Sequence, residues 1–136
     1  MDIISFVKHK PEVIYVYDDF TLKEALELME KHRFTSIPIL SRDGKYIGSI
    51  TEGDLLWKII RIDGYNSKKA DALKVSDIER CRDYLPIRVD QKMDELILKA
   101  AEENFVPIID ENDLFIGIVT RKTILTYFFE HNFIVL

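Results

Sequence analysis

The sequence predicts an α+β (α/β) fold made of two similar repeats, each a small sheet flanked by two helices. Two observations predict this fold. Short apolar strands and amphipathic helices follow one another in the same order in both halves of the 136-residue chain. A unit of ~50 to 60 residues also buries too little apolar surface to be stable alone. We therefore expect the two repeats to pack sheet to sheet with pseudo-twofold symmetry.

An internal duplication begins near residue 38. Positions 69 apart are identical or share apolar character, which is the signature of a repeat. The paired positions are Pro38, Ile39, Ile47, Gly48, Thr51, Leu55, Leu56, Ile59 and Ile60 with Pro107, Ile108, Ile116, Gly117, Thr120, Ile124, Leu125, Phe128 and Phe129.

The repeats differ in length upstream of this region. Asp18 precedes Pro38 by twenty positions, whereas Asp90 precedes Pro107 by seventeen. The second repeat should therefore be shorter by about one helical turn. We expect a first repeat with its N-terminal segment at 1–62, a solvated linker at 63–74, and a second repeat at 75–136.

The first repeat carries local signals for each element. Thr21 and Glu24 form a T-x-x-E capping box ahead of an apolar stripe, which predicts a helix over 22–32. The runs SIPIL and YIGSI predict strands, and Asp43-Gly44 between them supplies the positive φ angles of a tight hairpin. After Thr51, apolar pairs four residues apart predict a second helix.

The second repeat restates this order. Apolar residues at Met93, Leu96, Ile97 and Ala100 predict its first helix. The runs VPIID and FIGIV predict strands joined by a turn at ENDL, and RKTILTYFFEH predicts the closing helix.

Composition excludes several classes of protein. The chain is 47% hydrophobic and 32% charged, with no apolar run near the ~20 residues of a membrane span, so we expect no membrane association. A net charge of −5 opposes nucleic-acid binding. One cysteine, Cys81, fits a reducing compartment, which together with the absence of a signal peptide predicts a cytoplasmic protein.

The segment GSITEGD, Gly48 to Asp54, and its counterpart 69 residues later carry a family resemblance. Each follows an apolar-Pro-apolar strand, and together they resemble a tandem pair of cystathionine beta-synthase (CBS) domains, often called a Bateman module. The resemblance covers about 11–131. It implies a regulatory unit that binds adenosine compounds such as AMP, ADP, ATP, S-adenosylmethionine or, in some bacterial members, cyclic di-AMP, in two clefts between the repeats.

The first implied cleft centres on Thr51 and Asp54. A hydroxyl at a helix start can bind phosphate beside free amide groups, and a carboxylate one turn later can accept both ribose hydroxyls. The resemblance assigns phosphate to Thr51 and ribose to Asp54, and it places the adenine side on Ile87, Asn104, Phe105, Val106 and Pro107. The alternative is that Thr51 and Asp54 only cap a helix.

The second implied cleft departs from the family pattern. Thr120 keeps the hydroxyl, but Thr123 replaces the ribose carboxylate, and Arg121 and Lys122 oppose the dipole of their helix. An anionic ligand would explain these cations, and the pattern resembles bacterial CBS-pair proteins that bind cyclic di-AMP. Solvated surface charges are the alternative. The adenine side of this cleft would come from Val13, Ile14, Thr35, Ser36, Ile37 and Pro38.

No catalytic residue and no metal site are predicted. His9, His32 and His131 are far apart in sequence, and none belongs to a zinc or hydrolase motif. We expect no prosthetic group, and an adenine nucleotide as the regulatory ligand.

An excess of aromatic residues on the closing helices suggests a homodimer. Phe128, Phe129 and Phe133, with Trp57 on the matching helix, could meet a second copy or fill an internal core. The expected function is a nucleotide sensor that signals to a separate, unidentified effector protein. The rivals are a ligand-free dimerising interaction module and an enzyme that acts on a bound nucleotide.

Overall fold

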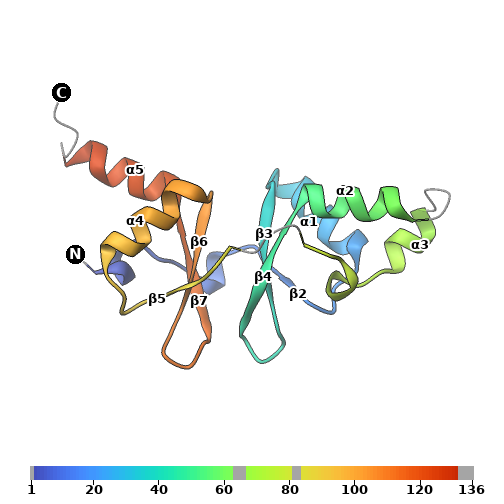
Figure 1. Ribbon diagram of the computed structural model, residues 1–136, viewed down its shortest axis with the longest axis horizontal. Helices are drawn as coiled ribbons and strands as arrows, with labels where there is room; N and C mark the ends of the chain where they lie inside the picture. Colours follow the sequence, from blue (N-terminus) through green and yellow to red (C-terminus); the bar gives the residue numbers. More distant parts are fainter. Residues whose placement is uncertain (1, 63–66, 81–83, 132–136) are drawn as a thin grey trace. The chain divides into compact units, whose positions relative to one another are not determined.

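The structure is a computed structural model that describes residues 2–62, 67–80 and 84–131 (Figure 1). In chain order the elements are η1 Ile3–Phe6, β1 Lys8–His9, η2 Lys10–Glu12, β2 Val16–Tyr17, α1 Leu22–His32, β3 Ser36–Leu40, β4 Tyr46–Thr51, α2 Glu52–Arg61, α3 Ser67–Ala72, η4 Val75–Asp77, β5 Ile87–Arg88, α4 Met93–Glu102, β6 Phe105–Ile109, β7 Phe115–Thr120 and α5 Arg121–Glu130. The mixed fold with two small sheets confirms the predicted fold class.

The chain divides into two compact units. The continuous unit is Ile14–Asp83, and the discontinuous unit joins Met1–Val13 to Tyr84–Leu136. These units differ from the stretches 1–62 and 75–136 that the sequence repeats suggest. The physical reason is core packing, because Ile3 is buried with the second repeat while Val75 is buried with the first.

The continuous unit contains a three-stranded sheet in the order β2-β3-β4. Strand β2 is parallel to β3, and β3 is antiparallel to β4, with Ser36 opposite Thr51. Helices α1 and α2 pack their apolar faces on this sheet. Its buried core comprises Val16, Leu22, Ala25, Met29, Ile37, Ile39, Ile50, Leu55, Val75 and Ile78.

The discontinuous unit contains a four-stranded sheet in the order β1-β7-β6-β5. Its β5-β6-β7 part repeats the arrangement of the first sheet, and β1 from the N-terminal segment adds an antiparallel edge strand. The backbone of β1 approaches Gly117 closely, because a Cβ built there would lie 2.1 Å from the carbonyl oxygen of Lys8. The core comprises Ile3, Ile87, Leu96, Ala100, Val106, Ile108, Val119 and Ile124.

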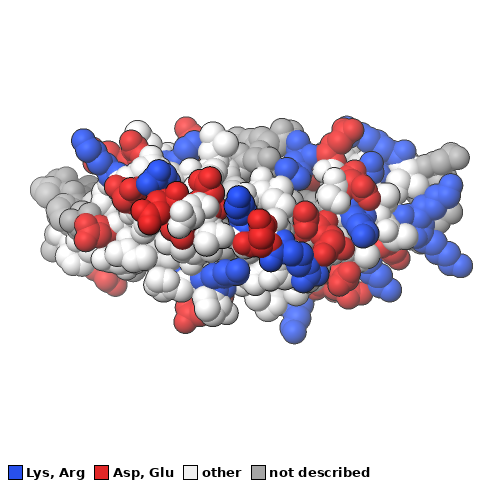
Figure 2. Space-filling model, turned by 90° about the horizontal axis from the view of Figure 1, so that it is seen from below, with Lys and Arg blue, Asp and Glu red and all other residues white. Residues whose placement is uncertain are grey.

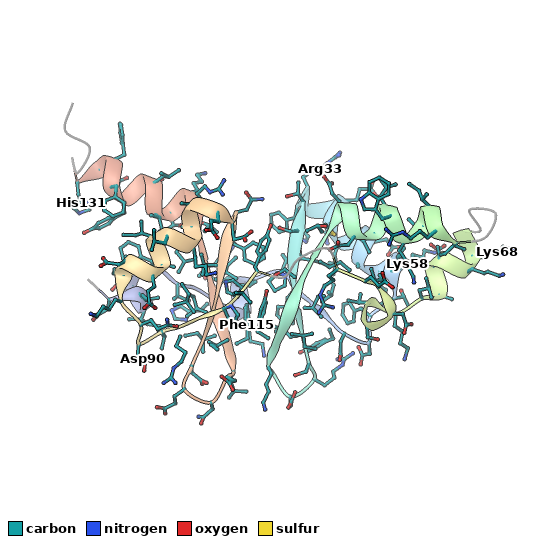
Figure 3. The ribbon with its side chains drawn as sticks, viewed as in Figure 1. Arg33, Lys58, Lys68, Asp90, Phe115 and His131 are labelled. Atoms are coloured by element: carbon teal, nitrogen blue, oxygen red, sulfur yellow. The ribbon has the colours of Figure 1, made fainter. Side chains whose placement is uncertain are left out.

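Local signals place the start of α1 as predicted, and the predicted β3–β4 turn holds in part. Thr21 and Glu24 form the expected capping box of α1. Arg33 (Figure 3), the residue directly after this helix, is in the left-handed region at φ 58°. In the β3–β4 hairpin only Gly44 of the predicted pair has positive φ, at 89°. Its counterpart in the β6–β7 hairpin is Asp113, at φ 64°. Aspartate tolerates this conformation better than most side chains.

The predicted difference in length between the two repeats is wrong. Val16 pairs with Ile39 and Ile87 with Ile108, so the second repeat is shorter here by two residues rather than a helical turn. One residue is lost from the helix and one from the loop after it. Within the predicted linker 63–74, α3 packs on α1 and α2 and buries Ala70, while Lys68 and Lys69 are exposed. Residues 63–66 lie outside the described part.

Candidate functional site

The start of α2 positions the two residues of the first predicted cleft. The hydroxyl Oγ1 of Thr51 accepts a hydrogen bond from the backbone N–H of Asp54 at 3.1 Å. Oδ2 of Asp54 accepts one from the backbone N–H of Thr51 at 3.0 Å. The Asp54 side chain is only 4% exposed. The structure therefore shows the capping arrangement that the sequence left as an alternative, and it places the carboxylate beside the positive end of the helix.

A hollow of about 410 Å³ opens beside this carboxylate, lined by Asp54, Trp57, Arg61, Glu79 and Arg80. All five residues belong to the continuous unit. Its volume lies within the range of about 300 to 1,000 Å³ that small-molecule sites occupy. The lining combines carboxylates, guanidinium groups and one indole.

The sequence reasoning missed Arg61, Glu79 and Arg80 and gave Trp57 only a dimer role. Helical spacing offered part of the signal, because residues three and seven positions after Asp54 lie on the same side of α2. Glu79 and Arg80 could not be found this way, since they follow η4 in a segment whose position depends on tertiary packing.

The start of α5 holds the second predicted set. The hydroxyl of Thr120 accepts a hydrogen bond from the backbone N–H of Thr123 at 3.2 Å, and the two hydroxyls lie 2.8 Å apart. A hydroxyl pair thus stands where α2 has a hydroxyl and a carboxylate. Lys122 is exposed.

Arg121 has a structural partner that the sequence did not reveal. Its Nε donates to the carbonyl oxygen of Ala100 at 2.8 Å, and Nη2 lies 3.4 Å from the carbonyl oxygen of Ala101. These carbonyls belong to the last turn of α4, where no intrahelical donor is available and a cation is favoured. The capping of α4 therefore accounts for an arginine at the first position of α5, and no ligand is needed to explain it.

Within each unit, the loop before one strand lies against a helix start. The carbonyl of Thr35 accepts a hydrogen bond from the N–H of Glu52 at 3.0 Å, beside Thr51. The carbonyl of Asn104 accepts one from the N–H of Arg121 at 2.9 Å, and Phe105 pairs with Thr120. The structure thus brings together residues that the sequence assigned to different clefts.

Most of the predicted adenine-facing residues are buried in strands or beside them. The buried members are Val13, Ser36, Ile37, Pro38, Ile87, Phe105, Val106 and Pro107, while Thr35 and Asn104 are exposed and Ile14 is half-buried. Each predicted cleft draws on both units. The two clefts therefore stay predictions.

A charged and aromatic cluster fixes the β3–β4 hairpin at the other end of the continuous unit. Arg42 makes two hydrogen bonds of 2.8 Å to the carboxylate of Asp19, and its guanidinium lies 4.0 Å from the ring centre of Tyr17. The hydrogen bonds from Arg42 lower the pKa of Asp19 below its ordinary value. The hydrogen bond with Tyr17 raises the pKa of the neighbouring Tyr15 hydroxyl.

Other kinds of site find no support in the described residues. Among them, no group of three or more His, Cys, Asp or Glu side chains could hold a metal ion. None of their helices has the length and apolar character that a membrane crossing requires. Figure 2 shows Lys and Arg interspersed with Asp and Glu on one face of the molecule, which is unlike the basic stripe of a nucleic-acid interface.

In the comparison with known proteins, one family profile matches two stretches of the chain. The CBS domain profile matches residues 4–61 and 75–130. A cystathionine beta-synthase of Dictyostelium discoideum is 31% identical over 122 residues, which cover 86% of this chain and 23% of that protein. A homoserine O-acetyltransferase of Methanohalophilus mahii is 31% identical over 117 residues, which cover 83% of this chain and 22% of that protein. The chain therefore spans about a fifth of the length of these enzymes.

Solved structures share the fold over nearly the whole chain. CbpB of Listeria monocytogenes, in complex with c-di-AMP, has a TM-score of 0.84 at 22% identity, and 98% of each chain is covered. The CBS-pair protein CBSX2 of Arabidopsis thaliana has a TM-score of 0.77 at 18% identity, again with 98% of each chain covered. At these identities the likeness is one of fold.

Proposed function

This chain belongs to the CBS domain family, and on that premise we propose that it is a regulatory module that senses an adenine nucleotide. The ligand, AMP, ADP, ATP or cyclic di-AMP, binds in clefts between the two repeats and changes what a separate effector protein recognises. The proposed setting is the cytoplasm, without catalytic activity. The single observation that carries this proposal is the buried Asp54 carboxylate at the start of α2.

The chemistry of this position suits a nucleotide. A carboxylate accepts hydrogen bonds from adjacent ribose hydroxyls, and the amide groups of a helix start favour an anion nearby. The solved complex of Listeria CbpB with c-di-AMP supports the same class of ligand for this chain. In the second cleft, the exposed Lys122 beside Thr120 would add a charge for phosphate.

Regulation requires that the ligand bind two states of the protein unequally, since equal affinity shifts no equilibrium. The proposed readout is the geometry of a homodimer. Leu56 and Ile60 on α2 are exposed, as are the matching Leu125 and Phe129 on α5. Exposed apolar pairs of this kind favour contact with another protein surface. Phe133, which the sequence analysis added to this face, lies outside the described residues.

The same apolar pairs favour the alternative function, a ligand-free dimerising interaction module. Calorimetric titration of the full chain with AMP, ADP, ATP, S-adenosylmethionine and cyclic di-AMP separates the two. Saturable heat with at least one of these ligands is the expected result. No heat with any of them, together with a dimer in analytical ultracentrifugation, would replace the sensor with the interaction module.

A further inference from the structure

We propose that the exposed face of α2 binds the exposed face of α5 of a second copy, so that two copies pair head to tail. The continuous unit of each copy then meets the discontinuous unit of the other. This inference rests on the homodimer of the proposed function and specifies which surfaces meet. The alternative is self-pairing, in which α2 meets α2 and α5 meets α5.

The two helices present matching positions to solvent. Each helix directly follows the last strand of its sheet, β4 for α2 and β7 for α5 (Figure 1). Spacings of three and four residues keep the exposed positions on one side of each helix. The α2 ridge consists of Leu56, Trp57, Ile60 and Arg61, and the α5 ridge consists of the matching Leu125, Thr126, Phe129 and Glu130, all exposed.

The apolar side chains of the two ridges favour association. Leu56 and Ile60 are 53% and 38% exposed, and the matching Leu125 and Phe129 are 58% and 77% exposed. Such side chains lose contact with water when another protein surface covers them. Because an apolar pair is present on both ridges, it favours either pairing equally.

Side-chain size differs between the ridges at one position. Trp57 is 55% exposed, and its counterpart on α5 is the much smaller Thr126. In self-pairing, each indole would lie near the second copy's indole across the twofold axis, and each threonine near a threonine. In head-to-tail pairing, an indole faces a small side chain at both contacts, which suits interdigitated packing. Side-chain size therefore favours head-to-tail pairing.

Charge changes sign between the ridges. Arg61 ends α2 and the exposed Glu130 ends α5 at the matching position. Self-pairing would bring like charges together on both ridges, whereas head-to-tail pairing brings Arg61 near the second copy's Glu130 twice. The present partner of Arg61 is easily exchanged. Its Nη1 lies 3.8 Å from Oε2 of Glu79, and an ion pair between such exposed side chains contributes little.

The first helix of each repeat shows the same reversal of charge. Helices α1 and α4 match at an offset of 71, which aligns their buried positions. Lys31 near the end of α1 and the matching Glu102 at the end of α4 are both exposed and opposite in charge. Glu24 and Glu95 keep one sign, because both lie in a first turn, where the helix dipole favours an acidic side chain. Since α1 contacts α2 and α4 contacts α5, the reversal extends the complementarity of the two units.

Charge reversal in the full chain tests the pairing, with the dimer dissociation constant measured by analytical ultracentrifugation at low salt. Arg61→Glu places like charges at both contacts of a head-to-tail dimer, so the dissociation constant should rise about tenfold. The double variant Arg61→Glu, Glu130→Arg restores opposite charges and should regain the wild-type affinity. In self-pairing, both variants only exchange one pair of like charges for another, and their dissociation constants would equal that of the wild type.

A matched control and an internal probe accompany this measurement. Arg88→Glu makes the same change of charge at an exposed arginine of β5, outside both ridges, and should leave the dissociation constant unchanged. Circular dichroism checks that each variant is folded. Trp57 is the only tryptophan in the chain, so its emission should shift on dilution with the same midpoint as dissociation. Constant emission across that midpoint would remove Trp57 from the contact and refute the pairing.

Cross-linking identifies the helices that meet. In a Cys81→Ser background, Leu56→Cys and Leu125→Cys are introduced into separate chains of different length. The two variants are oxidised singly and as a mixture in which copies exchange. Head-to-tail pairing predicts a disulfide dimer only in the mixture, between the two chain lengths. Self-pairing predicts a disulfide dimer in each single variant.

The outcomes separate this pairing from the broader function. If Arg61→Glu dimerises like the wild type and each single cysteine variant cross-links to itself, head-to-tail pairing is refuted, while the homodimer and the sensor function survive. If the wild-type chain is a monomer at every concentration, the pairing and the homodimer readout are both refuted, and nucleotide calorimetry decides the sensor function independently. Assemblies that grow beyond a dimer with concentration would reveal an open contact and refute the closed pair.

Discussion

Replacing Asp54 with alanine separates its two roles, as a helix cap and as a ligand group. The Asp54 carboxylate holds the backbone N–H of Thr51 at 3.0 Å in a nearly closed environment. Loss of that acceptor costs about 1 to 2 kcal/mol, and loss of a negative charge at the start of α2 costs about 0.3 to 1 kcal/mol. The free energy of unfolding should therefore fall by about 2 kcal/mol, as measured by urea denaturation.

The same change should weaken the nucleotide. A charged acceptor for ribose hydroxyls contributes about 1 to 3 kcal/mol to binding, which corresponds to a loss of affinity of roughly five- to 150-fold. Calorimetry at a temperature where the variant stays folded measures this loss. A 2′-deoxynucleotide should lose much less affinity than the ribonucleotide, since it lacks one of the two hydroxyls.

Glu24→Ala is the matched control, because Glu24 closes the same kind of capping box in α1. Its carboxylate accepts a hydrogen bond from the Thr21 N–H at 3.1 Å, but in an exposed position, so the expected stability loss is only about 0.5 to 1 kcal/mol. Nucleotide affinity should be unchanged. Equal stability losses in the two variants, with full affinity retained in Asp54→Ala, would reduce Asp54 to a helix cap and refute its ligand role.

Three further substitutions test features outside this position. Gly117→Ala should separate β1 from β7, because the new Cβ would lie 2.1 Å from the Lys8 carbonyl oxygen; the expected loss is about 2 to 4 kcal/mol in urea denaturation. Arg42→Ala should raise the pKa of Asp19 toward its ordinary value, as measured by NMR titration. Since the folded pKa of Asp19 is lowered, the stabilisation from this pair is present above the ordinary carboxyl pKa and is lost as the pH falls through the lowered value. Arg121→Ala removes the donors to the last carbonyls of α4 and should cost about 1 to 2 kcal/mol in thermal or urea unfolding.

Controls are available for these variants. Gly53→Ala makes the same chemical change as Gly117→Ala, but its Cβ would meet only the Thr51 hydroxyl at 3.6 Å, inside a helix, so stability should rise by about 0.5 to 1 kcal/mol. Wild-type stability in Gly117→Ala would contradict the close approach of β1. An unchanged Asp19 titration in Arg42→Ala would contradict the ion pair, and unaltered unfolding of Arg121→Ala would contradict its capping role.

Much of the fold follows from signals that act within a few residues. The capping box of Thr21 and Glu24, the apolar stripe after it and the turn at Gly44 each depend on contacts between near neighbours in the chain. Such contacts form in the same way wherever the segment is placed. The bounds of α1 and the two hairpins were therefore predictable from residue types and spacing alone.

The contacts between segments that are distant in the sequence were not predictable in the same way. The sequence duplication placed Ile3 with the first repeat, yet it is buried in the core of the second. The cations at the start of α5 suggested a ligand, yet Arg121 binds carbonyls about twenty residues earlier in the chain. Both contacts join distant parts of the sequence, and residue spacing carries no information about which distant surface a side chain meets.

The sequence by itself determined the duplicated order of strands and helices, the family resemblance and the identity of Thr51 and Asp54 as a pair at a helix start. Only the tertiary structure decided that the N-terminal segment completes the second sheet, that α3 occupies the expected linker, and that Arg61 and Arg80 reach the hollow beside Asp54. This difference between what the sequence determined and what the tertiary structure decided has one physical cause. Hydrogen bonding and helical periodicity act locally, whereas the burial of apolar surface selects among contacts along the whole chain.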